Sequence, residues 1–104
     1  MTSQKTWLAG STASRLDRAR FDAAEAELRA AGAEPVVPHR GAVGRTMRRD
    51  LTTMLIACDQ IVTVPGWQAS PSARLQVHVG EAVGIPVGSL AQWRLIHTPA
   101  AEVA

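Results

Sequence analysis

The stretch 60-QIVTVPGWQASPSARLQ-76 contains a strand, a turn and the start of a helix in direct succession. Gln60–Val64 is the clearest strand of the chain because β-branched residues dominate it, and Pro65-Gly66 ends it. Open α/β sheets bind ligands beyond the carboxyl ends of such strands. This stretch therefore predicts both the class of fold and the place of a ligand site.

The segment that follows, residues 73–79, fits two periodicities. Its apolar residues alternate as in a strand, while Leu75, Val79 and Val83 recur at helical spacing. The alternation of strands and helices elsewhere in the chain favours a helix, because parallel strands are joined by helical crossovers. The strand Ile85-Pro86-Val87 is then expected to complete the unit.

The same alternation extends towards the N-terminus. Strands are predicted at 6–9 and 35–38, and helices at 14–31 and 46–57. The first helix has an apolar face formed by Phe21, Ala24, Leu28 and Ala31, and the second has one formed by Met47, Leu51, Met54, Leu55 and Cys58. Residues 93–96 are expected to add an edge strand, and residues 97–104 a frayed tail. We therefore expect one α/β domain over 1–104, a doubly wound, flavodoxin-like parallel sheet of four or five strands with helices on both faces.

Composition narrows the class of protein. The 104 residues are 46% hydrophobic and 19% charged, as expected of one soluble globular domain, and no apolar run is long enough to cross a membrane. The single cysteine, Cys58, and an N-terminus without a signal peptide predict a cytoplasmic protein. Cys58 is interpreted as a core residue. A chain this short buries a small share of its surface, which favours a homodimer.

Several ligand classes find little support in the sequence. Arg40, Arg45, Arg48 and Arg49 lie within ten residues, but no aromatic residues alternate with them, so a solvated helix start is favoured and nucleic acid stays a minor hypothesis. The histidines at 39, 78 and 97 lack metal-ligand spacing. No dinucleotide or Walker fingerprint is present, and neither a metal nor a cofactor is expected.

Three loops are expected at the carboxyl edge of the sheet. The loops after the first and third strands each lead into a helix, whose free backbone amides favour an anion such as phosphate. The candidate ligand-binding residues in the three loops are Gly10, Ser11, Arg15, His39, Gly66, Trp67, Ser70 and Ser72. Trp67 fits either a lid over a base or the core, and its place after Pro65-Gly66 favours the pocket.

Five short motifs occur in order between Trp7 and Val87. They are Leu8-Ala9-Gly10-Ser11, Arg48-Arg49-Asp50-Leu51, Cys58-Asp59-Gln60-Ile61, Pro65-Gly66-Trp67 and Gly84-Ile85-Pro86-Val87. With these motifs the chain resembles the nucleoside 2-deoxyribosyltransferase superfamily, especially its small phage-associated members of unassigned function. The resemblance implies a nucleoside or nucleotide ligand, oligomers whose pockets a neighbouring chain completes, a glutamate nucleophile on the third ligand-side helix, and an acid on the preceding helix.

The chain departs from this pattern at the decisive position. The acid on the preceding helix matches Asp50, for which an ion pair with a nearby arginine is the alternative role. The nucleophile position matches Gln76, and Gln68 and Ser72 are further departures. A neutral amide is a poor nucleophile, whereas it can hydrogen-bond sugar hydroxyls. We therefore expect nucleoside or nucleotide binding with weak or no turnover. The alternative is an active N-glycoside hydrolase or deoxyribosyltransferase that uses another acid.

Overall fold

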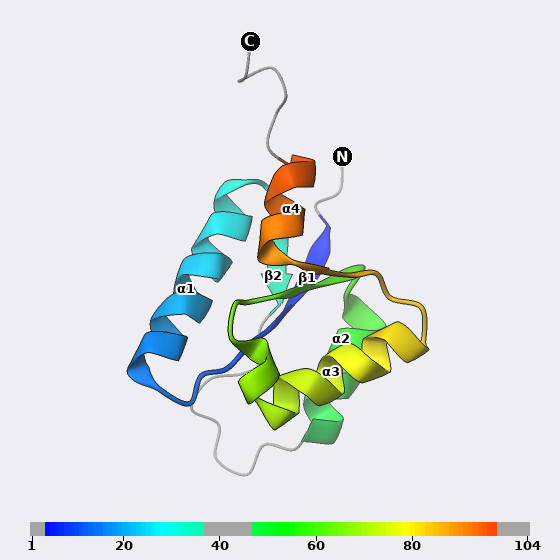
Figure 1. Cartoon of the computed structure of the whole chain (residues 1–104). Coiled ribbons are helices and arrows are strands. Elements are labelled where there is room, and N and C mark those ends of the chain that lie inside the picture. The colour runs from blue at the N-terminus through cyan, green and yellow to red at the C-terminus, as the bar shows by residue number, and fades with distance from the viewer. Residues whose placement is uncertain (1–3, 37–46, 98–104) are drawn as a thin grey trace.

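A four-stranded parallel sheet forms the centre of the molecule (Figure 1). The computed structural model describes residues 4–36 and 47–97. The strands are β1 (Lys5–Ala9), β2 (Glu34–Val36), β3 (Gln60–Thr63) and β4 (Val87–Ser89), in the order β2-β1-β3-β4. All three pairings are parallel. The predicted doubly wound, flavodoxin-like sheet is confirmed.

Helices cover both faces of this sheet. They are α1 (Arg15–Ala30), α2 (Met47–Ala57), α3 (Pro71–Ala82), α4 (Leu90–His97) and the short 3-10 helix η1 (Trp67–Ala69). Successive strand residues point to opposite faces, so Trp7 and Leu8 belong to different cores. Leu8 packs with Phe21 of α1 and Trp93 of α4. Trp7 packs with Met54 of α2 and with residues of α3.

The boundaries of α1 follow from local hydrogen bonds. The hydroxyl of Ser14 accepts from the backbone N of Asp17 at 3.0 Å and caps the start of the helix. Gly32, at φ 94°, follows the other end, where few residues other than glycine adopt that conformation. Phe21 and Leu28 are buried as predicted, whereas Ala31 is exposed beyond the last turn.

The ambiguous segment after residue 70 is helical, as the crossover argument predicted. Ser70 caps α3 by accepting from the backbone N of Ala73 at 3.2 Å, and Pro71 occupies the first helical position. Gly80 lies so close to β3 that an added Cβ would collide with Cδ1 of Ile61. This contact fixes the distance between α3 and the sheet.

The predicted edge strand at residues 93–96 is wrong, because this segment belongs to α4. Ser89 and Gln92 form a reciprocal capping box: the Ser89 backbone N donates to Gln92 Oε1 at 2.9 Å, and the Gln92 backbone N donates to Ser89 Oγ at 3.1 Å. Trp93 then packs into the α1-side core, and Arg94 binds Glu27 through two hydrogen bonds of 2.6 and 2.8 Å. The last strand is also displaced, since β4 begins at Val87 rather than Ile85.

Most of the predicted frayed tail falls beyond the residues that the structure describes. Residue 97 closes α4, and the rest of the predicted tail, 98–104, lies outside the described residues. Within 4–36 and 47–97, none of the helices has the length and apolar character needed to cross a membrane.

Candidate functional site

The carboxyl edge of the sheet holds the predicted ligand loops. The chain leaves β1 for α1 on one face and leaves β3 for α3 on the other, so the two loops diverge between neighbouring strands (Figure 1). Such a switch point is where open α/β sheets bind ligands. The loop after β2, with candidate residue His39, lies outside the described residues.

Gly10 allows the loop after β1 to pass close to its neighbours. A Cβ at this position would lie 2.9 Å from Cβ of Val64 and 3.1 Å from Cδ2 of Phe21. Real Cβ atoms essentially never come within 3.0 Å of another atom, and the contact with Phe21 would also be tighter than usual. The structure therefore gives Gly10 a packing function between Phe21 of α1 and Val64, the residue that follows β3, and this close approach brings the two loops together.

Ser11 is buried, and its hydroxyl is engaged within the protein. Ser11 Oγ donates to Oδ2 of Asp17 at 2.9 Å and accepts from the backbone N of Ala13 at 3.2 Å. Arg15, the first residue of α1, is exposed. Ser11 thus shapes the loop, while Arg15 projects its charge from the start of the helix.

Arg20 is a candidate that sequence reasoning missed. Its guanidinium Nη1 lies 3.9 Å from Oδ1 of Asp17 and would lie 3.7 Å from a Cβ at Gly66. The side chain of Arg20 therefore lies next to the loop after β3. The sequence does show that Asp17 and Arg20 are one helical turn apart, a spacing that places both charges on the same side of α1.

The loop after β3 contains four of the predicted residues. Gly66, at φ 90°, is the N-cap that precedes η1, and Trp67 is half-buried against the α3-side core. The Ser70 hydroxyl caps α3, whereas Ser72 is exposed on the first turn of that helix. The packing of Trp67 gives it a structural role whether or not it also contacts a ligand.

Gln76 is held inside the protein, facing the sheet. Only 4% of its surface is exposed, and its Oε1 accepts from Nε1 of Trp7 at 3.1 Å. Its Nε2 makes a weak contact to Sδ of Met47 at 3.9 Å. The amide thus satisfies a buried indole N–H and joins β1, α3 and α2.

The structure places Asp50 on the helix next to Gln76. Asp50 lies on α2, three residues after Met47, and is half-buried. One helical turn therefore separates it from the residue that touches Gln76. The two predicted catalytic positions lie on neighbouring helices on the same side of the sheet.

The described side chains offer few reactive groups. Burial, followed by the charge of Asp59, raises the pKa of the Cys58 thiol to about 11, so Cys58 is a poor nucleophile at neutral pH. Cys58 packs against the α3-side core, in agreement with its interpretation as a core residue. In the described segments, no three His, Cys, Asp or Glu side chains gather in a way that could hold a metal ion. The edge is suited to binding an anion through arginines and backbone amides.

Comparison with known proteins identifies a family without an assigned activity. No curated protein and no solved structure matches the chain. Residues 4–89, which include all four strands and the candidate site, match the family Domain of unknown function (DUF4406), and the chain belongs to this family.

Proposed function

We propose that this protein binds a nucleoside or nucleotide at the carboxyl edge of the sheet and turns it over weakly or not at all. The proposal depends mainly on one observation: Gln76 is a buried amide that is hydrogen-bonded to the indole of Trp7. The resemblance places a carboxylate nucleophile at this position. An amide there keeps the architecture and removes the reactive group.

The chemistry of the amide supports the absence of turnover. A carboxylate can attack an anomeric carbon and form a glycosyl ester, whereas a neutral amide is a poor nucleophile. The Oε1 atom of Gln76 also accepts the Trp7 hydrogen bond. Attack through this oxygen would disturb a buried hydrogen bond in addition to starting from a weak nucleophile.

The surroundings of the edge support binding of a phosphate-bearing ligand. The N-termini of α1 and α3 begin in the two loops that diverge there, and both favour negative charge. Arg15 is exposed at the start of α1, and Arg20 lies beside Gly66. These groups form a cationic rim on the side where the sugar phosphate of a nucleotide is expected.

The proposal includes the setting of the protein. It is a cytoplasmic homodimer comparable to the small phage-associated members of the superfamily that it resembles. The half-buried thiol of Cys58 suits a reducing compartment. No step of the proposed binding needs a metal or cofactor.

Ligand titration tests the binding. We expect deoxynucleoside monophosphates, added as probes in calorimetric titrations, to bind the unmodified chain, and Arg20→Ala to weaken this binding by about tenfold or more. Arg29→Ala is the matched control, because Arg29 is an exposed arginine in the last turn of α1, paired with Glu25 at 3.1 Å. Equal losses in both variants, or no binding of any probe, would exclude this site. Mass spectrometry of small molecules carried through purification identifies the natural ligand.

Base release, measured by chromatography, tests the loss of turnover. We expect none from the unmodified protein and measurable release from Gln76→Glu, which Asp50→Asn in the same background abolishes. Robust release from the unmodified protein would show that another acid serves as the nucleophile. Binding without release in Gln76→Glu would show that the pocket has diverged from the enzymes it resembles.

A further inference from the structure

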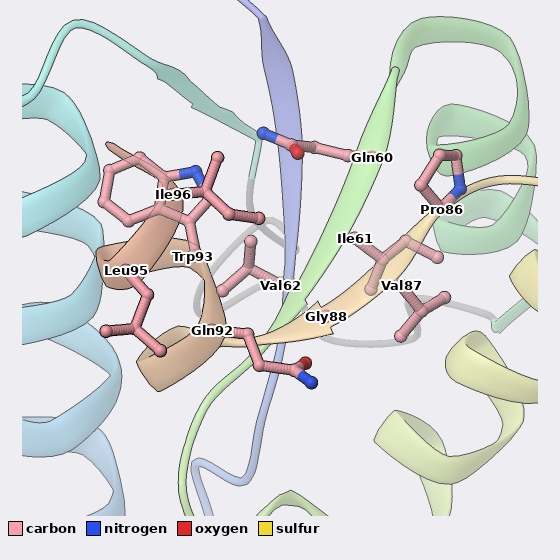
Figure 2. A pocket seen from close by; sticks show the side chains of 10 residues that line it. All are labelled: Gln60, Ile61, Val62, Pro86, Val87, Gly88, Gln92, Trp93, Leu95 and Ile96. Carbon is pink, nitrogen blue, oxygen red and sulfur yellow. The ribbon is translucent and has the colours of Figure 1, made fainter. Parts of the chain in front are cut away.

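A groove of about 450 Å³ runs along α4, over β3 and β4 (Figure 2). Trp93 and Ile96 of α4 line it on one side and Pro86 on the other, with Val62 between them. It extends to Gln60, the first residue of β3, and Pro86 precedes β4. The groove therefore includes the amino ends of β3 and β4, and it also reaches Gly88 of β4 and Gln92 of α4, but no described residue of the loops after β1 and β3 lines it.

Exposed aliphatic side chains stand beside this groove. Leu95 is 82% exposed and Ile96 is 77% exposed, and both belong to the wall that α4 forms. Large exposed apolar side chains next to an apolar groove mark an interaction surface. A protrusion and a groove on one face allow two copies related by a two-fold axis to fill each other's groove.

The charge of the face favours a second copy as the occupant. None of the ten described residues that line the groove carries an ionisable side chain, although 11 basic and 9 acidic residues occur among the 104 of the chain. In a two-fold interface the same surface faces itself, so a neutral lining avoids repulsion between like charges. A charged ligand or peptide would lose its hydration here without gaining an ionic partner.

We propose that two copies of the chain associate through this face, with Leu95 and Ile96 of each copy inserted into the groove of the other. Stable interfaces contribute about 20 to 30 residues from each partner, and the ten lining residues are about half of the smaller number. We therefore expect a weak dimer, with a dissociation constant on the order of micromolar. The nucleotide site stays open in it, because none of the described residues assigned to that site lines the groove.

Sedimentation velocity of the full chain between about 2 and 200 µM tests the proposal. We expect the mass to rise with concentration from 11.1 kDa towards twice that value. Leu95→Glu places like charges in both copies of the interface and raises the dissociation constant by about tenfold or more. Pro86→Arg, on the opposite wall of the groove, has the same effect and provides a second variant should Leu95→Glu fail to fold.

Ile56→Glu is the matched control. Ile56 is 81% exposed and lies on α2, on the other side of the sheet, so this variant dimerises like the unmodified chain. A monomer at every concentration would overturn the proposal, as would equal weakening by Ile56→Glu and Leu95→Glu. A monomeric chain carrying an apolar small molecule that Leu95→Glu releases would assign the groove to that molecule instead. Titration of Leu95→Glu with a nucleotide separates dimerisation from the proposed nucleotide binding, because we expect this variant to bind the nucleotide as tightly as the unmodified chain does.

Discussion

The change Gln76→Glu is predicted to make the stability of the protein depend on pH. The variant retains the shape of the side chain and an acceptor for the Trp7 indole. Position 76 is 4% exposed and is the sixth residue of α3, beyond the first turn where the helix dipole favours negative charge. Burial therefore raises the pKa of the new carboxyl group above the ordinary value of a glutamate.

The sign and size of the effect follow from linkage. A carboxyl group with a raised pKa is more easily protonated in the folded state, so the variant keeps its stability below the unfolded pKa. It loses stability as pH rises through the folded pKa. For a group this buried that keeps one hydrogen-bond donor, we expect a loss of about 3 kcal/mol between about pH 4 and pH 8. This is a large part of the stability of a small domain.

Urea unfolding followed by circular dichroism at both pH values measures this loss relative to the unmodified chain. Gln76→Met is the control, since it has no titrating group. It leaves the buried indole N–H of Trp7 without its acceptor and costs about 1–3 kcal/mol at every pH. An equal stability difference between Gln76→Glu and the unmodified chain at pH 4 and pH 8 would refute the reasoning. The carboxylate would then be solvated or paired in the folded protein.

Three further predictions concern the packing, the thiol and the surface charges. Gly80→Ala destabilises the fold by about 1–3 kcal/mol. The loss is smaller in an Ile61→Val background, because valine lacks the Cδ1 atom with which the new methyl group collides. An equal fall in melting temperature in both backgrounds would contradict this explanation. Cys58 reacts with iodoacetamide at pH 8 about 100-fold more slowly in the folded than in the urea-unfolded chain, because folding raises its pKa from the ordinary 9.0 to about 11. Equal rates in the two states would show that the thiol is exposed to solvent. Arg94 lowers the pKa of Glu27 mainly through its hydrogen bond. The pair therefore stabilises the fold above the unfolded pKa of Glu27. This contribution is lost as pH falls through the lowered pKa of Glu27 in the folded state. Arg94→Met costs at most about 1 kcal/mol by urea unfolding at neutral pH, because the pair is largely exposed, and a larger loss would assign Arg94 a role in packing.

Local sequence signals predicted most of the fold. Strand composition, glycine stops and the alternation of elements located the four strands and the first three helices. Residues 73–79 fitted both a strand and a helix, and the need for a helical crossover between parallel strands correctly predicted the helix. The edge strand at 93–96 was wrong because its apolar run was given more weight than the capping box of Ser89 and Gln92, which is visible in the sequence.

The site depends on contacts that no local pattern contains. Gln76 and Trp7 are 69 residues apart, and only the parallel sheet brings α3 over β1. Arg20 lies near Gly66 because α1 follows β1, and β1 is the neighbour of β3 in the sheet. The sequence predicted the positions of the loops, and the hydrogen bonds of Ser11 are local, to Ala13 and Asp17, whereas the internal engagement of Gln76 required the folded arrangement.

The central place of β1 has a consequence for synthesis. Trp7 of β1 pairs with Ile61 of β3, so one of its two neighbouring strands follows 54 residues later. At about 5–20 residues per second, the ribosome needs roughly 3–10 s to supply that partner. During the first half of this interval β1 has no neighbouring strand. Once β2 is made, it pairs with Lys5–Trp7 in the described residues, whereas Leu8 and Ala9 still await their partners in β3. The nascent chain is therefore most exposed to aggregation and chaperone binding before β3 emerges, and slower translation between the two strands would lengthen that period.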